Sequence, residues 1–177
     1  IVSEMDEVIP ALVAAVQEQH ATGDHYRDDA IRQAMEHQAQ LALRPGPVRV
    51  DVIVDPPWSD GQINSVQVVT GDRPFLVDTV ASCLLRHGWR VEDVRHPIIG
   101  VKRDRGTIEA VGMPGRGGCA SESWIHIDAT APLGTDIGQA AEQLRDDLCA
   151  CLDQVVCATD DWGAMHEAML RTAELVS

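Results

Sequence analysis

Aromatic residues are scarce in this chain of 177 residues. They make up 3% of it, with one Phe, one Tyr and four Trp. The interior must therefore be built mainly from Val, Ile, Leu and Ala, a composition that suits a sheet covered by helices. The chain also lacks any uninterrupted apolar run near the roughly 18 residues that a membrane-spanning helix needs. We therefore expect a protein that does not span a membrane.

Basic residues are also few, with 14 Lys and Arg against 28 Asp and Glu, which gives a formal charge of −14. Such a surface repels phosphate backbones and anionic lipid headgroups, so nucleic acid and membrane are not expected as partners. The chain begins with Ile1 and lacks the basic and apolar opening of a secretory signal. We expect the natural polypeptide to extend beyond one or both ends.

Cysteine is present in an odd number, and most of the cysteines lie inside apolar patterns. This usage differs from a disulfide framework and is typical of a reducing cytoplasm. The pair Cys149 and Cys151 would point about 200° apart on a helix, which disfavours a shared metal ion. The five positions are Cys83, Cys119, Cys149, Cys151 and Cys157.

The first 44 residues predict two amphipathic helices, with the first ending near Gly23 and Asp24 capping the second. Their apolar faces are narrow, so we expect them to pack on the rest of the molecule. Two prolines and a glycine at 45–47 end this segment. The organisation that we predict is an N-terminal helical segment at 1–44, an α+β domain at 45–158 and a C-terminal helix at 159–177.

Within the α+β domain the apolar period alternates between two and about 3.6 residues, which indicates strands and helices in turn. Read from residue 63, the order is strand, helix, strand, strand, helix, strand. This βαββαβ order is typical of a ferredoxin-like fold, an antiparallel sheet with two helices on one face. The predicted strands cover 48–54, 63–70, 89–103, 107–111, 122–129 and about 155–157, and the predicted helices cover 74–87 and 134–152.

The strand at 122–129 places aromatic and ionisable side chains on one of its two faces. Ile125, Ile127 and Ala129 share the core face. Trp124 and His126 must then share the opposite face with Asp128. Such a face fits catalysis, a subunit contact or cover by an added helix, and cover by the N-terminal helices is slightly favoured because they need no association entropy.

The turn at 71–74 is the second candidate site. A strand that leads into a helix offers free backbone N–H groups and the positive end of the helix dipole, where a carboxylate can dock. Pro74 suits the first position of the helix. Alternatively, Asp72 itself caps the helix and no ligand binds. His96, held extended by Pro97, is expected to have a structural role.

The turn Asp72-Arg73-Pro74, followed by Leu76 and Val77 on a helix, resembles the helix start of ACT domains. These are small regulatory modules that often bind amino acids between paired copies. Many of them place Gly directly after this Pro so that backbone can approach the ligand. Here Phe75 stands in that place, and a bulky side chain there favours a structural role over binding.

A longer set of strings is similar to the N-terminal region of large bacterial NAD-specific glutamate dehydrogenases and spans residues 63 to 165. The strings are GDRPFLVDTV at 71–80, His96-Pro97, Arg103-Asp104, ESWIHI at 122–127, and Asp161-Trp162 with Met165.

The resemblance implies a non-catalytic regulatory or assembly module. The parent enzyme would oxidatively deaminate L-glutamate to 2-oxoglutarate in the cytoplasm, using NAD bound by a distant catalytic domain. This segment would have no cofactor, catalytic or metal residues of its own. Its partners would be the remainder of the polypeptide, further copies of the chain and an amino-acid effector.

Two alternatives remain open, a stand-alone amino-acid sensor and a small metal-dependent enzyme using His96, His126 and cysteines. The candidate ligand or interface residues are Asp72, Arg73, Pro74, Phe75, Trp124 and His126.

Overall fold

The computed structural model describes residues 5–18, 28–59, 61–160 and 171. Within them lie four helices and one antiparallel sheet of six strands, so the predicted α+β, ferredoxin-like class is confirmed. The elements are α1 (Met5–Glu18), α2 (Asp28–Ala42), β1 (Val48–Ile53), β2 (Asn64–Gly71), α3 (Leu76–Arg86), β3 (Arg90–Arg95), β4 (Ile98–Asp104), β5 (Thr107–Gly112), β6 (Ala120–Thr130) and α4 (Ile137–Asp160).

The sheet has the order β1-β2-β6-β4-β5, and β3 also pairs with β6. β3 and β4 are two halves of one predicted strand, interrupted at His96 and Pro97, and they pair with successive halves of β6. The break costs little hydrogen bonding, because the Pro97 carbonyl oxygen accepts a bond from the Trp124 backbone N–H at 3.0 Å. Proline without an N–H donor is tolerated at such a break.

The predicted strand at 155–157 is wrong. α4 continues without interruption through Val155 and Val156 to Asp160. The sheet edge that a last strand would occupy belongs to β1, which pairs with β2 from Val48 opposite Thr70 to Ile53 opposite Ser65. With that edge filled, the apolar residues at the end of α4 keep the helical spacing set by Leu144, Leu148 and Leu152.

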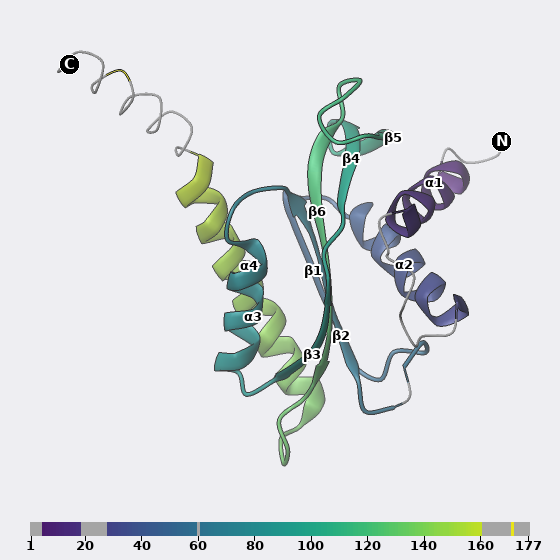
Figure 1. The fold of residues 1–177 in the computed structure, drawn as a ribbon. Helices are drawn as coiled ribbons and strands as arrows, with labels where there is room; N and C mark the ends of the chain where they lie inside the picture. The colour runs from purple at the N-terminus through teal and green to yellow at the C-terminus, as the bar shows by residue number, and fades with distance from the viewer. Residues whose placement is uncertain (1–4, 19–27, 60, 161–170, 172–177) are drawn as a thin grey trace.

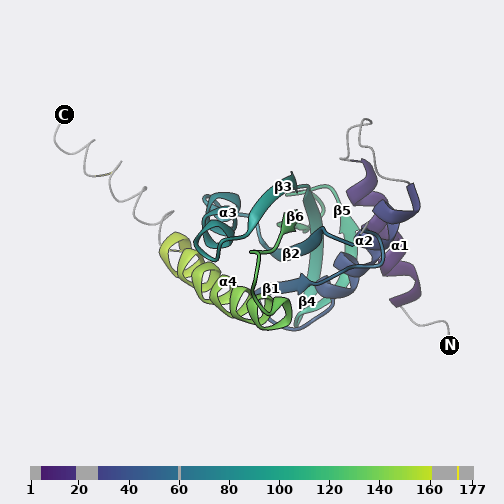
Figure 2. The same ribbon diagram turned by 90° about the horizontal axis from the view of Figure 1, so that it is seen from below.

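The helices form a layer on each side of the sheet (Figures 1 and 2). α3 and α4 cover one face, over a core that includes Val66, Val68, Ile125 and Ile127. α1 and α2 cover the other face, where Trp124 packs in a second core. Both faces of β6 are therefore buried, as the run of buried residues along it shows. The expectation that the N-terminal helices cover the Trp124 face is confirmed.

Apart from the end of α4, which lies at Asp160 instead of the predicted 152, the element boundaries within the described residues differ from the predictions by a few residues. α3 begins at Leu76, so Pro74 precedes the helix rather than opening it. Gly88 follows the C-cap with φ of 75°, the left-handed conformation expected of a glycine after a helix. The end of the first helix near Gly23, the cap at Asp24 and the C-terminal helix at 159–177, apart from 159, 160 and 171, lie outside the described residues. None of the helices described is long and apolar enough to cross a bilayer.

Candidate functional site

The turn between β2 and α3 is fixed by bonds from both of its charged side chains. Asp72 bonds its backbone N–H to the Ser121 carbonyl oxygen at 2.9 Å, and its Oδ1 accepts from Ser123 Oγ at 2.7 Å. Ser123 Oγ lies 2.9 Å from His96 Nε2. Since the hydroxyl donates to Asp72, His96 donates to the hydroxyl. Asp72 therefore anchors the turn to β6.

The pKa of His96 is lowered by burial, although the negative charge of Asp72 opposes this shift. A neutral His96 with its proton on Nε2 satisfies the observed bond. This arrangement supports the structural role predicted for His96. It differs from a catalytic triad, because Ser123 is fully buried and gives its proton to the aspartate, away from the imidazole.

Arg73 ties the same turn to the last described turn of α4. Its Nη1 donates to Val156 O at 3.3 Å, Thr159 Oγ1 at 3.0 Å and Asp160 Oδ1 at 2.9 Å. A cation beside the final carbonyl groups of a helix is favoured by the helix dipole. Arg73 thus links the start of α3 to the end of α4.

Asp72 does not cap α3, which corrects one of the two interpretations of this turn. The N-cap residue is Phe75, and no side chain among the described residues makes a cap hydrogen bond to α3. Phe75 has φ of 71° and ψ of 5°, the left-handed region, and 64% of its surface is exposed. Its ring therefore does not fill a pocket. Pro74, next to it, is also exposed.

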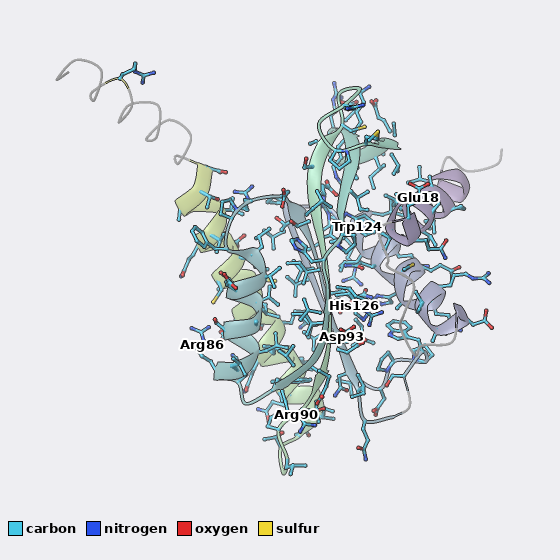
Figure 3. All side chains as sticks on the ribbon, in the orientation of Figure 1. Glu18, Arg86, Arg90, Asp93, Trp124 and His126 are labelled. Atoms are coloured by element: carbon cyan, nitrogen blue, oxygen red, sulfur yellow. The ribbon has the colours of Figure 1, made fainter. Side chains whose placement is uncertain are left out.

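Trp124 and His126 lie on the opposite face of the sheet from these bonds, beneath α1 and α2 (Figure 3). The structure thus divides the six candidate residues into two groups. Trp124 is fully buried, and its Nε1 finds no hydrogen-bond partner among the described residues. Its role is to fill the core under the N-terminal helices.

His126 belongs to a polar cluster that joins α2 to the sheet. Gln67 Nε2 donates to the Ala34 carbonyl oxygen at 2.9 Å and contacts His126 Nδ1 at 3.1 Å. His126 Nε2 lies 3.0 Å from Asp128 Oδ1, and Arg95 pairs with the same carboxylate. An amide N–H facing Nδ1 assigns the imidazole proton to Nε2. We therefore describe His126 as neutral, donating to Asp128.

Burial lowers the pKa of His126, while its hydrogen bond to Asp128 opposes the shift. The cluster extends into α2 through His37 Nδ1, which is 2.8 Å from Gln67 Oε1. Sequence reasoning missed Gln67. A polar residue within the valine-rich β2 is the signal that would have identified it, because a buried amide needs partners.

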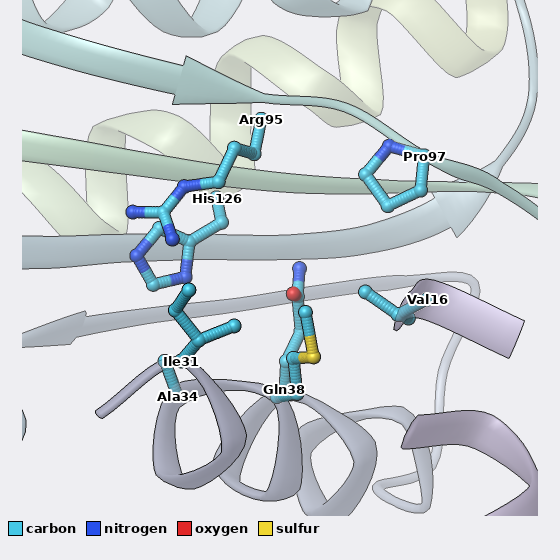
Figure 4. A pocket seen from close by; sticks show the side chains of 8 residues that line it. Val16, Ile31, Ala34, Gln38, Arg95, Pro97 and His126 are labelled. Atoms are coloured by element: carbon cyan, nitrogen blue, oxygen red, sulfur yellow. The ribbon is translucent and has the colours of Figure 1, made fainter. Parts of the chain in front are cut away.

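A small cavity lies beside His126, between α2 and the sheet (Figure 4). Its polar lining comes from Gln38, Arg95 and His126, and its volume is about 10 Å³. Gln38 is already bonded through Nε2 to the Ile125 carbonyl oxygen at 2.9 Å. A volume of this size holds about one water molecule and excludes an amino acid or a cofactor.

The residues named for a metal-dependent enzyme are not brought together. His96 bonds Ser123 and His126 bonds Asp128, on opposite faces of the sheet. Within the described part of the chain, no group of three His, Cys, Asp or Glu side chains is placed to hold a metal ion.

Comparison with known proteins agrees with this architecture. A model of the glutamate dehydrogenase ACT1 domain matches residues 12–148, which run from α1 into α4. Comparison with curated proteins finds no match. Since the family match spans well over half of the sequence and includes both helical layers and the whole sheet, the chain belongs to the ACT1 domain family of glutamate dehydrogenases.

Proposed function

We propose that this chain is a non-catalytic module that regulates or assembles a large NAD-dependent glutamate dehydrogenase. The parent enzyme would oxidatively deaminate L-glutamate to 2-oxoglutarate in the cytoplasm. Its NAD and its catalytic residues would lie in another part of the polypeptide. Family membership supports the parent activity, and the geometry of Phe75 supports the assembly role.

The conformation and exposure of Phe75 are the observations that support the proposal most directly. A non-glycine residue in the left-handed region costs roughly 1–2 kcal/mol. An aromatic ring with 64% of its surface exposed also leaves apolar area in water. Neither feature stabilises the isolated domain, and both are explained if the ring packs against the remainder of the polypeptide. Strained backbone held by its surroundings is typical of functional contacts.

The charged side chains beside Phe75 fit this role. Asp72 is held by Ser123, and Arg73 is held by the end of α4. The turn is thus fixed in place before any partner arrives, and a fixed anchor loses less entropy on binding than a mobile one. A displacement of Phe75 by a partner would therefore be transmitted to β6 through the Asp72 bond and to α4 through the Arg73 bonds.

Amino-acid sensing at this turn is a second candidate. The first turn of α3 lacks a side-chain cap among the described residues, so its backbone N–H groups are available to a carboxylate. Two carboxylates argue against amino-acid sensing at this turn, because Asp72 and the first-turn Asp78 repel an anionic ligand group. The same site would serve an amino-acid sensor acting on another enzyme.

The assembly role is tested by Phe75→Gly in the complete parent enzyme. Glycine tolerates the backbone conformation and removes the ring, so the isolated module should melt at an unchanged or higher temperature. We expect the parent enzyme to lose subunit association in sedimentation and to lose activity in parallel. The control is Leu133→Gly, since Leu133 is 98% exposed elsewhere on the surface. Normal assembly and activity of the Phe75→Gly enzyme would refute the assembly role.

Sensing is tested by thermal melting of the 177-residue chain with each L-amino acid at millimolar concentration. A specific rise in melting temperature that Phe75→Gly enlarges would favour the sensor. The isolated chain should neither reduce NAD in the presence of L-glutamate nor bind NAD in calorimetry. Turnover above a blank would contradict the non-catalytic assignment.

A further inference from the structure

Two cysteines from different helices meet at one arginine on the α3–α4 layer. Arg86 Nη2 lies 3.2 Å from Cys151 Sγ and 3.6 Å from Cys83 Sγ. Arg86 and Cys83 belong to α3, one turn apart, and Cys151 belongs to α4. Arg86 is labelled in Figure 3, on the outer side of α3.

The helices that carry these sulfurs run antiparallel and are joined along their length. Arg73 reaches Asp160 at one end, and His87 Nε2 reaches Asp147 Oδ2 at 2.8 Å at the other. The cysteines sit between these two contacts. Their sulfurs are therefore held near one another, because both lie within 3.6 Å of the same guanidinium nitrogen.

The two thiols differ in their surroundings. Cys83 is 1% exposed, and burial raises the pKa of its thiol. Cys151 is half-buried, and the guanidinium stands against its sulfur at 3.2 Å. Reactive cysteines are partly exposed and lie beside a cation, whereas buried ones react poorly with oxidants in solution. A sulfenic acid, once formed, condenses with a neighbouring thiol. Cys151 is thus the sulfur that meets an oxidant, and Cys83 is the one that resolves the product.

We propose that Cys83 and Cys151 form a redox-sensitive pair, which peroxide converts into a disulfide linking α3 to α4. The Cys151 thiolate attacks one oxygen of hydrogen peroxide, breaking the O–O bond and giving a sulfenic acid and hydroxide. The Cys83 sulfur then attacks the Cys151 sulfur, forming the S–S bond and expelling the oxygen as hydroxide, which the released thiol proton converts to water. In sum, two thiols lose two electrons and two protons, and one peroxide becomes two waters. This site goes beyond the proposed assembly role.

The disulfide would fix the two helices that the Arg73 turn already joins. It closes a loop that contains β3 to β6, so it restricts the unfolded chain strongly and should raise the melting temperature by roughly 5–10 °C. Reduction by a dithiol would return the original thermal stability.

The test treats the reduced 177-residue chain with a small excess of hydrogen peroxide. We expect titratable thiols to fall from five to three and the intact mass to fall by two hydrogens. A digest should contain one Cys83–Cys151 linked peptide that dithiothreitol removes. The matched variants are Cys83→Ser and Cys151→Ser, which should not form the link, and the exposed Cys157→Ser, which should form it normally.

Two further variants identify the roles. Cys83→Ser should accumulate the oxygen adduct on Cys151, because no thiol resolves it. Arg86→Gln should slow formation of the link several-fold without changing the final product. The proposal is overturned if peroxide leaves Cys83 reduced while oxidising Cys151 or Cys157 to sulfinic acid. It is equally overturned if the only disulfides formed join separate chains or other cysteine pairs.

Discussion

Truncation of Trp124 tests the central claim about the second core, that α1 and α2 complete the sheet. Trp124 is 0% exposed on the face that these helices cover. A buried indole removes about 150–250 Å² from water, worth about 4–6 kcal/mol at about 25 cal/mol per Å². The unfolded chain already buries part of that area, so this figure is an upper bound. We expect Trp124→Ala to lower the free energy of unfolding by about 3–5 kcal/mol.

Trp124→Phe separates the apolar contribution from the polar one. Phenylalanine keeps most of the ring and removes Nε1, which has no hydrogen-bond partner among the described residues. An unpaired buried donor costs about 1–3 kcal/mol, so its removal offsets most of the lost area. We therefore expect Trp124→Phe to change the free energy of unfolding by about 1 kcal/mol or less.

The measurement is urea denaturation followed by far-UV circular dichroism, because replacing Trp124 removes one of the fluorophores and so changes the emission by itself. The midpoint should shift strongly for Trp124→Ala and weakly for Trp124→Phe, with the slope unchanged. A loss below about 1 kcal/mol for the alanine variant would show that the helices do not bury this residue in solution. Equal losses for both variants would show that Nε1 has a partner.

Three further predictions follow from the same packing. Ile125→Asp should unfold the chain, since Ile125 is 0% exposed in the first core and a buried unpaired carboxylate costs several kcal/mol; an unchanged circular dichroism melt would contradict the face assignment. The contribution of His126 to the free energy of unfolding should be fully present well above pH 6.5, the unfolded pKa of its imidazole, because the folded pKa is lowered. That contribution should be lost as the pH falls below 6.5 towards the folded pKa. A His126→Gln variant should therefore lose less stability with falling pH in urea titrations, and an identical slope would refute the role of His126. Deleting residues 1–44 should shift tryptophan emission to the red and promote self-association in sedimentation, whereas a monomer with unchanged emission would show that these residues cover nothing.

Local chemistry made much of this fold predictable from the sequence. Period-two alternation assigned Ile125 and Ile127 to one face and Trp124 and His126 to the other, because successive side chains of a strand point in opposite directions. Proline at position 97 marked a break, and glycine at position 88 marked the end of a helix. These signals are properties of the residue and its neighbours, so they need no knowledge of distant contacts.

The strand predicted at 155–157 shows the limit of such signals. A short apolar run fits a strand or a helix end equally well, and the choice depends on whether a sheet edge is free. In the structure, β1 occupies that edge of the sheet. The conformation of residues 155–157 thus depends on a strand about 100 residues away in the sequence, and the local pattern at 155–157 contains no information about that strand.

The candidate sites depended on tertiary structure in the same way. The sequence by itself determined that Asp72, Arg73 and Phe75 form a turn before a helix and that His126 lies on the second face of β6. Only the folded chain decided that Asp72 bonds Ser123 instead of capping α3. It also decided that Arg73 reaches α4, and that Cys83 and Cys151 both contact Arg86. Hydrogen bonds and sulfur contacts act over a few ångströms, and which distant side chains come within that reach is set by the packing of whole elements.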